Sequence, residues 1–153
     1  MRKTVFIGMM LLVTVLTANA WAGPATQDEV VLKCKEAAKL IQDKGIDAGI
    51  QSIGSKEGPF VWKDTYVFLM DMDGKMLAHP MSPQLTKEKD LLSVKNTDGK
   101  LIFTEFVKLA NSKGDGWFDY MWPKPGQEKP AEKSTYIHRV PGTQYIVGAG
   151  IYK

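Results

Sequence analysis

The chain has 153 residues, of which 44% are hydrophobic and 24% charged, and its formal net charge is +3. This length predicts one globular domain with a substantial core. Without Arg2 and Lys3, 18 basic and 17 acidic residues remain, so the net charge is about +1. No basic run follows, which argues against binding to nucleic acid or to a membrane surface.

Residues 1–22 are typical of a secretory signal peptide. A basic start, Arg2-Lys3, precedes a short apolar run at residues 5–16, and Ala-x-Ala sites end at Ala20 and Ala22. The apolar run is too short for a membrane span, which needs about 20 residues. We expect cleavage after Ala20 or Ala22 and a periplasmic or secreted protein.

Two helices are expected next. Thr26 and Glu29 have the spacing of a capping box, which predicts a helix that ends before Gly45. Its apolar residues recur at helical spacing and include Cys34, the only cysteine of the chain. A lone cysteine on an apolar helical face is expected to be buried and unreactive. A second, short helix is expected at residues 46–53.

A hairpin follows these helices. Residues 65–71 are β-branched and aromatic, which predicts a central strand, and Asp73-Gly74 is a two-residue turn signal before a partner strand at residues 75–79. Residues 71–74 lack the further carboxylates and the distal glutamate of a calcium loop. A plain hairpin turn is therefore the better interpretation.

The middle of the chain is expected to be a polar loop at residues 81–96, with an amphipathic fragment around Leu91. Residues 96–99 could cap a helix at residues 101–111, whose mixed apolar face would pack on a sheet.

The last third of the chain predicts three more strands. Alternation puts Phe118, Tyr120 and Trp122 on one face of the first of them. Three large rings exceed what the core of so short a strand needs, so this face packs a helix or walls a pocket. The strands are expected at residues 117–122, 134–140 and 144–152.

Three blocks of this region occur in the order of a known family. GWFDYMWPKPG, EKSTY and YIVGAGIY resemble the C-terminal half of a single Cache domain, an extracytoplasmic sensor module, and the resemblance extends upstream to about Thr26. It implies an α+β, PAS-like domain over residues 24–153. In that fold a long N-terminal helix packs on a central antiparallel sheet, with a ligand pocket on the other face.

The resemblance also implies a set of ligand-binding residues. Lys133 matches a family lysine and would hold the negative charge of a ligand. Strict alternation places Lys133 and Tyr136 on opposite faces, so this role requires Lys133 to lie before the regular strand, in the loop after Pro130. The implied site comprises His79, Pro80, Trp117, Tyr120, Trp122, Lys133 and Tyr136.

One cation among aromatic rings suits a small anion with a short apolar tail, a carboxylate of two to four carbons. Cache domains usually precede a signalling domain, and this chain ends at Lys153. We therefore expect an exported sensor that acts in trans on a membrane receptor or sensor kinase. The alternative is a structural or protein-interaction module with a vestigial pocket.

The sequence does not indicate an enzyme, a metal site or a cofactor. His79 and His138 are isolated, and neither a nucleophile elbow nor a phosphate or dinucleotide loop occurs. Five methionines could indicate copper handling in the periplasm. Methionine more often fills a core, and these alternate with strand residues as filler would. They are Met70, Met72, Met76, Met81 and Met121.

Overall fold

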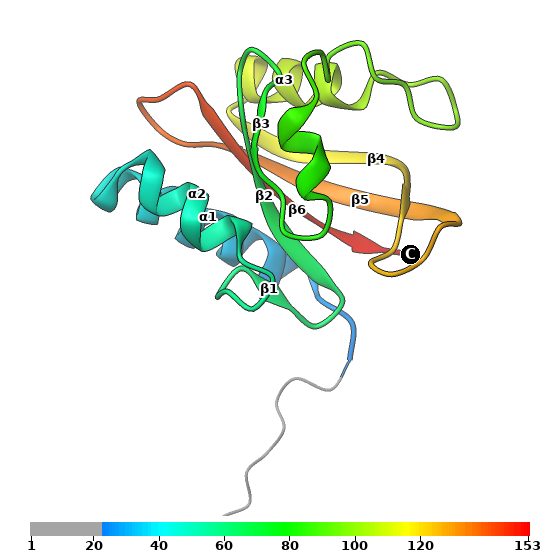
Figure 1. Ribbon diagram of the computed structural model, residues 1–153, viewed down its shortest axis with the longest axis horizontal. Coiled ribbons are helices and arrows are strands. Elements are labelled where there is room, and N and C mark those ends of the chain that lie inside the picture. Colours follow the sequence, from blue (N-terminus) through cyan, green and yellow to red (C-terminus); the bar gives the residue numbers. More distant parts are fainter. Residues whose placement is uncertain (1–22) are drawn as a thin grey trace, which may run out of the picture.

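The computed structural model describes residues 23–153, and the expected signal peptide lies outside the described residues. The chain folds as helices packed on both faces of an antiparallel sheet (Figure 1). In chain order the elements are α1 (Gln27–Lys44), α2 (Ile46–Gly54), β1 (Val61–Trp62), β2 (Thr65–Asp71), β3 (Met76–Ala78), the 3-10 helix η1 (Pro83–Lys87), α3 (Ile102–Ser112), β4 (Asp115–Pro123), β5 (Pro130–Arg139) and β6 (Tyr145–Tyr152).

The sheet has the order β1-β2-β6-β5-β4, and β3 also pairs with β2. The last strand, β6, therefore lies in the centre, between β2 and β5. Its register aligns Tyr152 with Lys133 of β5, and the β4–β5 register aligns Tyr120 with the same lysine. Lys133 is thus flanked by an aromatic residue on each neighbouring strand.

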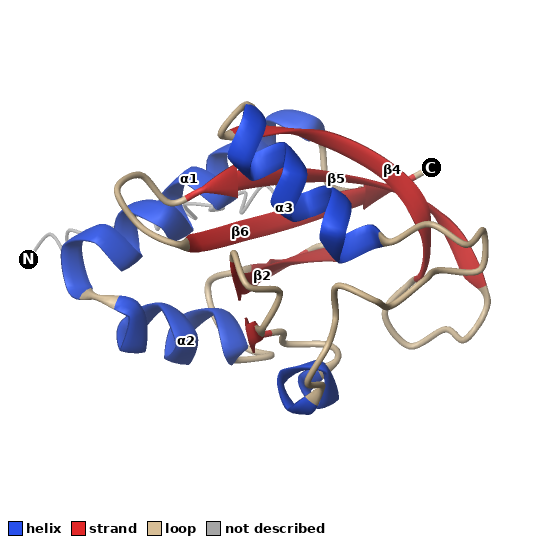
Figure 2. Ribbon diagram, turned by 90° about the horizontal axis from the view of Figure 1, so that it is seen from above, coloured by secondary structure: helices blue, strands red, loops and turns tan. Residues whose placement is uncertain are grey.

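Helices lie on both faces of the sheet (Figure 2), and each face carries a separate core. On one face α1 packs Val30, Cys34 and Ile41 against the sheet. On the other face α3 packs Phe103 and Phe106 against the sheet. The arrangement confirms the expected α+β, PAS-like fold, with the long N-terminal helix on one face of the sheet and α3 on the other.

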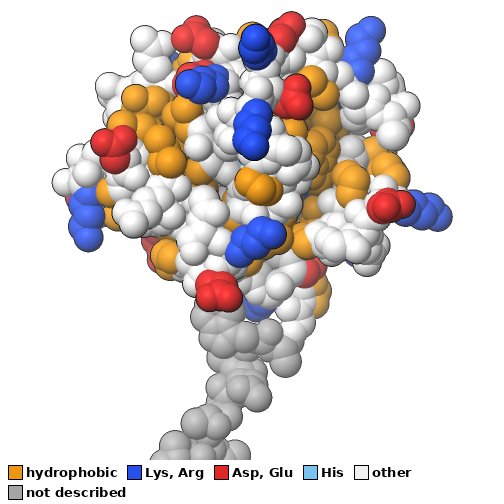
Figure 3. Space-filling model, in the orientation of Figure 1, with side chains coloured by type: hydrophobic (Ala, Val, Ile, Leu, Met, Phe, Trp, Pro, Cys, Tyr) orange, Lys and Arg blue, Asp and Glu red, His pale blue; other side chains and the backbone are white. Residues whose placement is uncertain are grey.

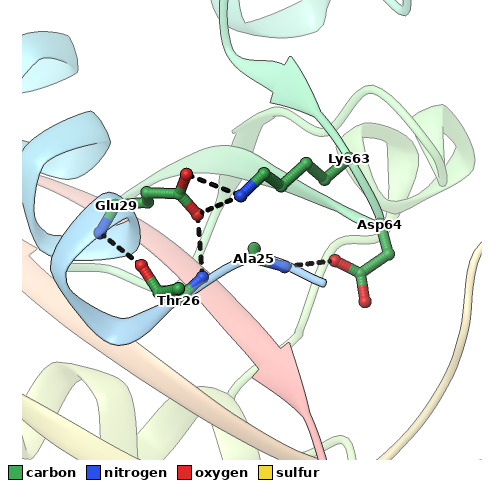
Figure 4. A network of polar contacts seen from close by, with 5 residues as sticks. All are labelled: Ala25, Thr26, Glu29, Lys63 and Asp64. Carbon is green, nitrogen blue, oxygen red and sulfur yellow. Dashed lines mark hydrogen bonds and ion pairs between the residues drawn. The ribbon is translucent and has the colours of Figure 1, made fainter. Parts of the chain in front are cut away.

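The start of α1 is fixed to the β1–β2 turn by a polar network (Figure 4). The capping box is present: the Thr26 hydroxyl accepts from the Glu29 N–H (3.3 Å), and Glu29 Oε2 accepts from the Thr26 N–H (2.9 Å). Lys63 Nζ lies 2.6 and 2.8 Å from the Glu29 carboxylate oxygens, and Asp64 accepts from the Ala25 N–H at 2.9 Å. The hydrogen bond from Lys63 lowers the pKa of Glu29.

Most elements confirm the sequence expectations. Asp71 closes the hairpin turn, because its Oδ1 accepts from the N–H groups of Asp73 and Lys75. The carboxylate is thus used within the turn, which agrees with a plain hairpin turn. The helix Ile102–Ser112 also agrees, but its expected cap is wrong. Leu101 is at the N-cap, and Asn96 instead accepts from the N–H groups two and four residues on, within its own loop.

The largest error concerns the start of β5, which begins at Pro130 rather than at Ser134. Proline is tolerated as the first residue of a strand, because its missing N–H is not needed there. Lys133 therefore lies inside the regular strand, and the expectation that it lies in the preceding loop is wrong.

Cys34 is buried in α1, as expected, and burial raises the pKa of its thiol. Within residues 23–153, no helix combines the length and the apolar character needed to cross a membrane. Charged side chains of both signs are interspersed over the face drawn in Figure 3.

Candidate functional site

A small cavity lies between α3 and the face of the sheet that α3 covers. Its volume is about 10 Å³, which is room for about one water molecule. It is lined by Tyr66, Phe68, Met76, His79, Ile102, Phe103, Phe106, Tyr120, Trp122 and Lys133.

Glycines in the central strand make room for this lining. A Cβ at Gly148 would lie 2.5 Å from Phe68 Cζ, and a Cβ at Gly150 would lie 2.7 Å from Lys133 Cε. The two glycines are two residues apart in β6, so a side chain at either position would point to the same face of the sheet. The Gly-x-Gly spacing of this strand therefore allows Phe68 and Lys133 to lie over the sheet.

Lys133 is the charged group of the cavity. Its side chain is 1% exposed, and its Nζ donates to the Tyr66 hydroxyl at 3.3 Å. The same nitrogen lies 4.4 Å from the centre of the Tyr66 ring and 4.9 Å from that of Tyr152. Among residues 23–153, no carboxylate lies within ion-pair distance of it.

Burial lowers the pKa of Lys133 to about 7, although Asp64 partly opposes the shift. A buried ammonium without a paired anion is costly, so the environment favours the neutral amine. A carboxylate bound in the cavity would supply the missing negative charge and favour the ammonium.

His79 is a neutral donor at the edge of the cavity. Its Nδ1 accepts from the Ser82 N–H at 2.9 Å, so in the neutral ring the proton is on Nε2. Burial and then the charge of Lys133 lower the pKa of His79 to about 3. Its ring centre lies 4.8 Å from that of Tyr66.

Tyr120 and Trp122 extend the wall of the cavity along β4. The Tyr120 hydroxyl shares a 3.0 Å hydrogen bond with the Thr135 hydroxyl, and burial raises the pKa of Tyr120. Trp122 is half-buried and packs edge-to-face on Phe103, with ring centres 6.4 Å apart.

The structure brings together four of the residues named from the sequence: His79, Tyr120, Trp122 and Lys133. Trp117 and Tyr136 do not belong to this cavity, and their expected place in it is wrong. Their rings lie 5.5 Å apart in the core under α1, on the opposite face of the sheet.

Pro80 is buried beside His79 but is not part of the lining. Sequence reasoning missed Tyr66, the hydrogen-bond partner of Lys133. The alternation of Tyr66 with Phe68 along β2 was a signal that could have revealed a second aromatic wall.

The described residues offer little for a metal ion. Among residues 23–153 there is no group of three or more His, Cys, Asp or Glu side chains placed to hold one. Met70 and Met76 are at most 1% exposed in the core under α3. These two methionines therefore fill the core.

Two curated relatives match the sequence over part of their length. The chain is 37% identical over 89 residues to the methyl-accepting chemotaxis protein McpP of Pseudomonas putida, a match that covers 58% of this chain and 16% of McpP. It is 29% identical over 90 residues to the sensor histidine kinase MctS of Rhizobium johnstonii, covering 59% of this chain and 19% of MctS. The chain thus spans less than a fifth of either relative.

Solved structures share the fold over most of the chain. One, described as the structural basis for carboxylic acid recognition by a Cache chemosensory domain, has a TM-score of 0.71 and 26% identity, covering 82% of this chain and 91% of that one. Another, a methyl-accepting chemotaxis protein from Vibrio parahaemolyticus, has a TM-score of 0.67 and 25% identity, covering 82% and 86%. The sequence profile of the Cache domain matches residues 60–153. The chain therefore belongs to the Cache domain family.

Proposed function

We propose that this Cache domain binds a carboxylate of two to four carbons in the cavity under α3, as an exported sensor. The observation that carries the proposal is Lys133, a fully buried lysine for which residues 23–153 provide no ion pair. The proposal is supported by the similar Cache domain described for carboxylic acid recognition.

Each group of the lining has a role in this proposal. The Lys133 ammonium donates to the carboxylate, a charge-assisted hydrogen bond worth about 1.5–3 kcal/mol. The His79 Nε2–H and the Tyr66 hydroxyl are neutral donors, which fix the orientation of the acid. The rings of Phe103, Tyr120 and Trp122 would enclose its apolar tail.

The size of the cavity favours a second candidate. At about 10 Å³ the cavity is filled by its own side chains and is too small for a carboxylate without rearrangement. A protein-interaction module with a vestigial pocket would have the same appearance. The two candidates differ in whether any small acid stabilises the protein.

A thermal-shift screen and calorimetry with acetate, propionate and butyrate would separate them. An acid present at 100 times its dissociation constant adds about 2.7 kcal/mol to the free energy of unfolding. Lys133→Met should lose this response. Lys108→Met, which removes an exposed lysine on α3, should keep it. Stabilisation by amino acids or sugars alone would refute the ligand class, and no stabilisation by any small molecule would favour the second candidate.

We also propose that the protein is periplasmic or secreted and that it is not an enzyme. The Ala-x-Ala sites and the sensory roles of the relatives support this. N-terminal analysis of the exported form should begin at Trp21 or Gly23, and an intact Met1 terminus in the membrane fraction would contradict cleavage.

The sensory relatives also support action in trans on a membrane receptor or sensor kinase. Acid-dependent co-purification of such a membrane protein would test it. Recovery of the same partner with and without the acid would contradict a ligand-dependent readout.

A further inference from the structure

A larger hollow lies outside the small cavity, between the segment that contains η1 and the turn that joins β4 to β5. Its volume is about 510 Å³, within the usual range for ligand pockets. Leu85 and Gln127 line its two sides. Tyr66 and Trp122 line both this outer hollow and the inner cavity, so the two side chains stand between them.

The inner cavity cannot admit an acid as it stands, because its volume is that of about one water molecule. A ligand that contacts Lys133 must therefore gain space from a wall that moves. The wall shared with the outer hollow is the one whose movement would also open a route from solvent.

Of the two shared side chains, Trp122 is the better placed to move. Tyr66 is 2% exposed, and its hydroxyl is held by Lys133. Trp122 is half-buried and lies one residue before the end of β4, where the chain enters the turn to β5. Trp122 packs edge-to-face on Phe103 and hydrogen-bonds to the Tyr66 hydroxyl, which lowers the pKa of that hydroxyl, so its movement would break one side-chain hydrogen bond.

Charge along the outer hollow supports entry of an anion. Its lining includes Lys56 and Lys124, and no carboxylate side chain is among the described lining residues. Lys124 Nζ lies 5.5 Å from the centre of the Tyr152 ring, and Lys133 Nζ lies 4.9 Å from the same centre. The outer lysine and the inner one therefore lie near the same ring, and cations along a route raise the rate at which anions enter.

We infer that anions reach Lys133 through the outer hollow, and that Trp122 is the movable partition that sets how long an acid the site accepts. This inference rests on the proposed function for its ligand class. It adds to that site an entrance through the outer hollow, and it assigns to Trp122 both the limit on acid length and the movement that sets the binding rate.

The test compares propionate and hexanoate binding to the wild type and to Trp122→Ala, with rates taken from NMR line shapes of the ligand methyl signal. The variant should bind and release propionate at least about tenfold faster, because the partition is gone. It should also bind hexanoate, which the wild type excludes. Phe118→Ala is the matched control, since Phe118 shares the face of β4 but lines neither space.

A second variant guards against misfolding. Trp122→Phe keeps an aromatic ring in the core and should show propionate rates between those of the wild type and Trp122→Ala.

The charge along the outer hollow is tested separately. Lys124→Gln should lower the association rate of propionate about two- to fivefold at low salt and leave the dissociation rate unchanged, and added salt should remove the difference. Lys39→Gln, on the exposed face of α1, is its control.

The outcomes separate the two proposals. The wild type could bind propionate while neither Trp122 variant changes the binding rates of propionate or admits hexanoate. In that case the role of Trp122 as a partition is overturned and the proposed function stands. If only Trp122→Ala binds acids, the partition stands and the proposed function of the natural chain fails. If no variant binds any acid, both are wrong.

Discussion

The Lys133 ammonium lies 3.3 Å from the Tyr66 hydroxyl, inside the face of the sheet that α3 covers. The two residues come from strands that are not neighbours, because β6 runs between β2 and β5. They can meet only because Gly150 of β6 has no side chain to separate them. The contact gives the Lys133 amine one neutral partner, and residues 23–153 give it no charged one.

Replacement of Lys133 by methionine should stabilise the ligand-free protein. The native pKa of about 7 lies below the ordinary value of 10.5. Below about pH 7 both native and unfolded states are protonated, and the native state bears the full cost of the buried charge, of the order of 5 kcal/mol at most. Between pH 7 and 10.5 the unfolded state holds more protons, so wild-type stability rises with pH. Urea unfolding should show that the free energy of unfolding of Lys133→Met exceeds that of the wild type by more at pH 6 than at pH 9. A constant difference would contradict the buried titration.

Carboxylate affinity should fall as the pH rises above about 7. Only the ammonium form of Lys133 pairs with the acid, and in the free protein this form is lost above its pKa of about 7. The decrease should approach about tenfold per pH unit until the pKa of the complex is reached. Calorimetry with propionate from pH 6 to 9 measures it. A flat profile would show that another group holds the anion.

Substitution of Gly150 by alanine should weaken both the fold and the site. The new Cβ would lie 2.7 Å from Lys133 Cε and from the Ser134 carbonyl oxygen, which the strand pairing holds in place. Overpacking of this kind costs about 1–3 kcal/mol. Gly54→Ala is the control, since its Cβ would meet only Ala78, at 3.8 Å. Equal unfolding midpoints for the two variants would mean that β6 can shift to accept the methyl group.

Loss of the charge on Glu29 should lower the melting temperature at neutral pH. Its carboxylate joins the start of α1 to Lys63, and this hydrogen bond lowers its pKa in the native state. Stability from a lowered carboxyl pKa is present above the unfolded pKa and is lost as the pH falls through the native one. The gap between wild type and Glu29→Gln should therefore close in acid. Glu36→Gln, on an exposed helix pair, should change the melting temperature little at either pH.

The sequence predicted which residues share a face more reliably than it predicted which face holds the site. Alternation correctly grouped Phe118, Tyr120 and Trp122, because it is a property of one strand. It also placed Lys133 and Tyr136 on opposite faces, as the structure has them, but it could not show which of the two faces holds the site. The resemblance named both residues for one site, and the packing of α1 on Tyr136 shows that Tyr136 does not belong to it.

The remaining errors have local causes. Pro130 marked a loop by its chemistry but begins a strand, so the expected position of Lys133 was displaced. Tyr66 could not be linked to Lys133, 67 residues away, without the strand order. Leu101, the N-cap of α3, provides no side-chain hydrogen bond, so packing of Phe103 and Phe106 replaces the usual polar signal.

The burial of Cys34 has a practical consequence for spectroscopy. It is the only cysteine of the chain, and its thiol is fully enclosed under α1 with a raised pKa. An exposed thiolate is the nucleophile that attacks thiol reagents, so this buried residue should not react in the folded protein. Cysteines introduced at exposed positions such as Gln84 and Gln127 would therefore accept spin labels selectively without removal of Cys34. The distance between the two labels, measured with and without acid, would report directly on the width of the outer hollow.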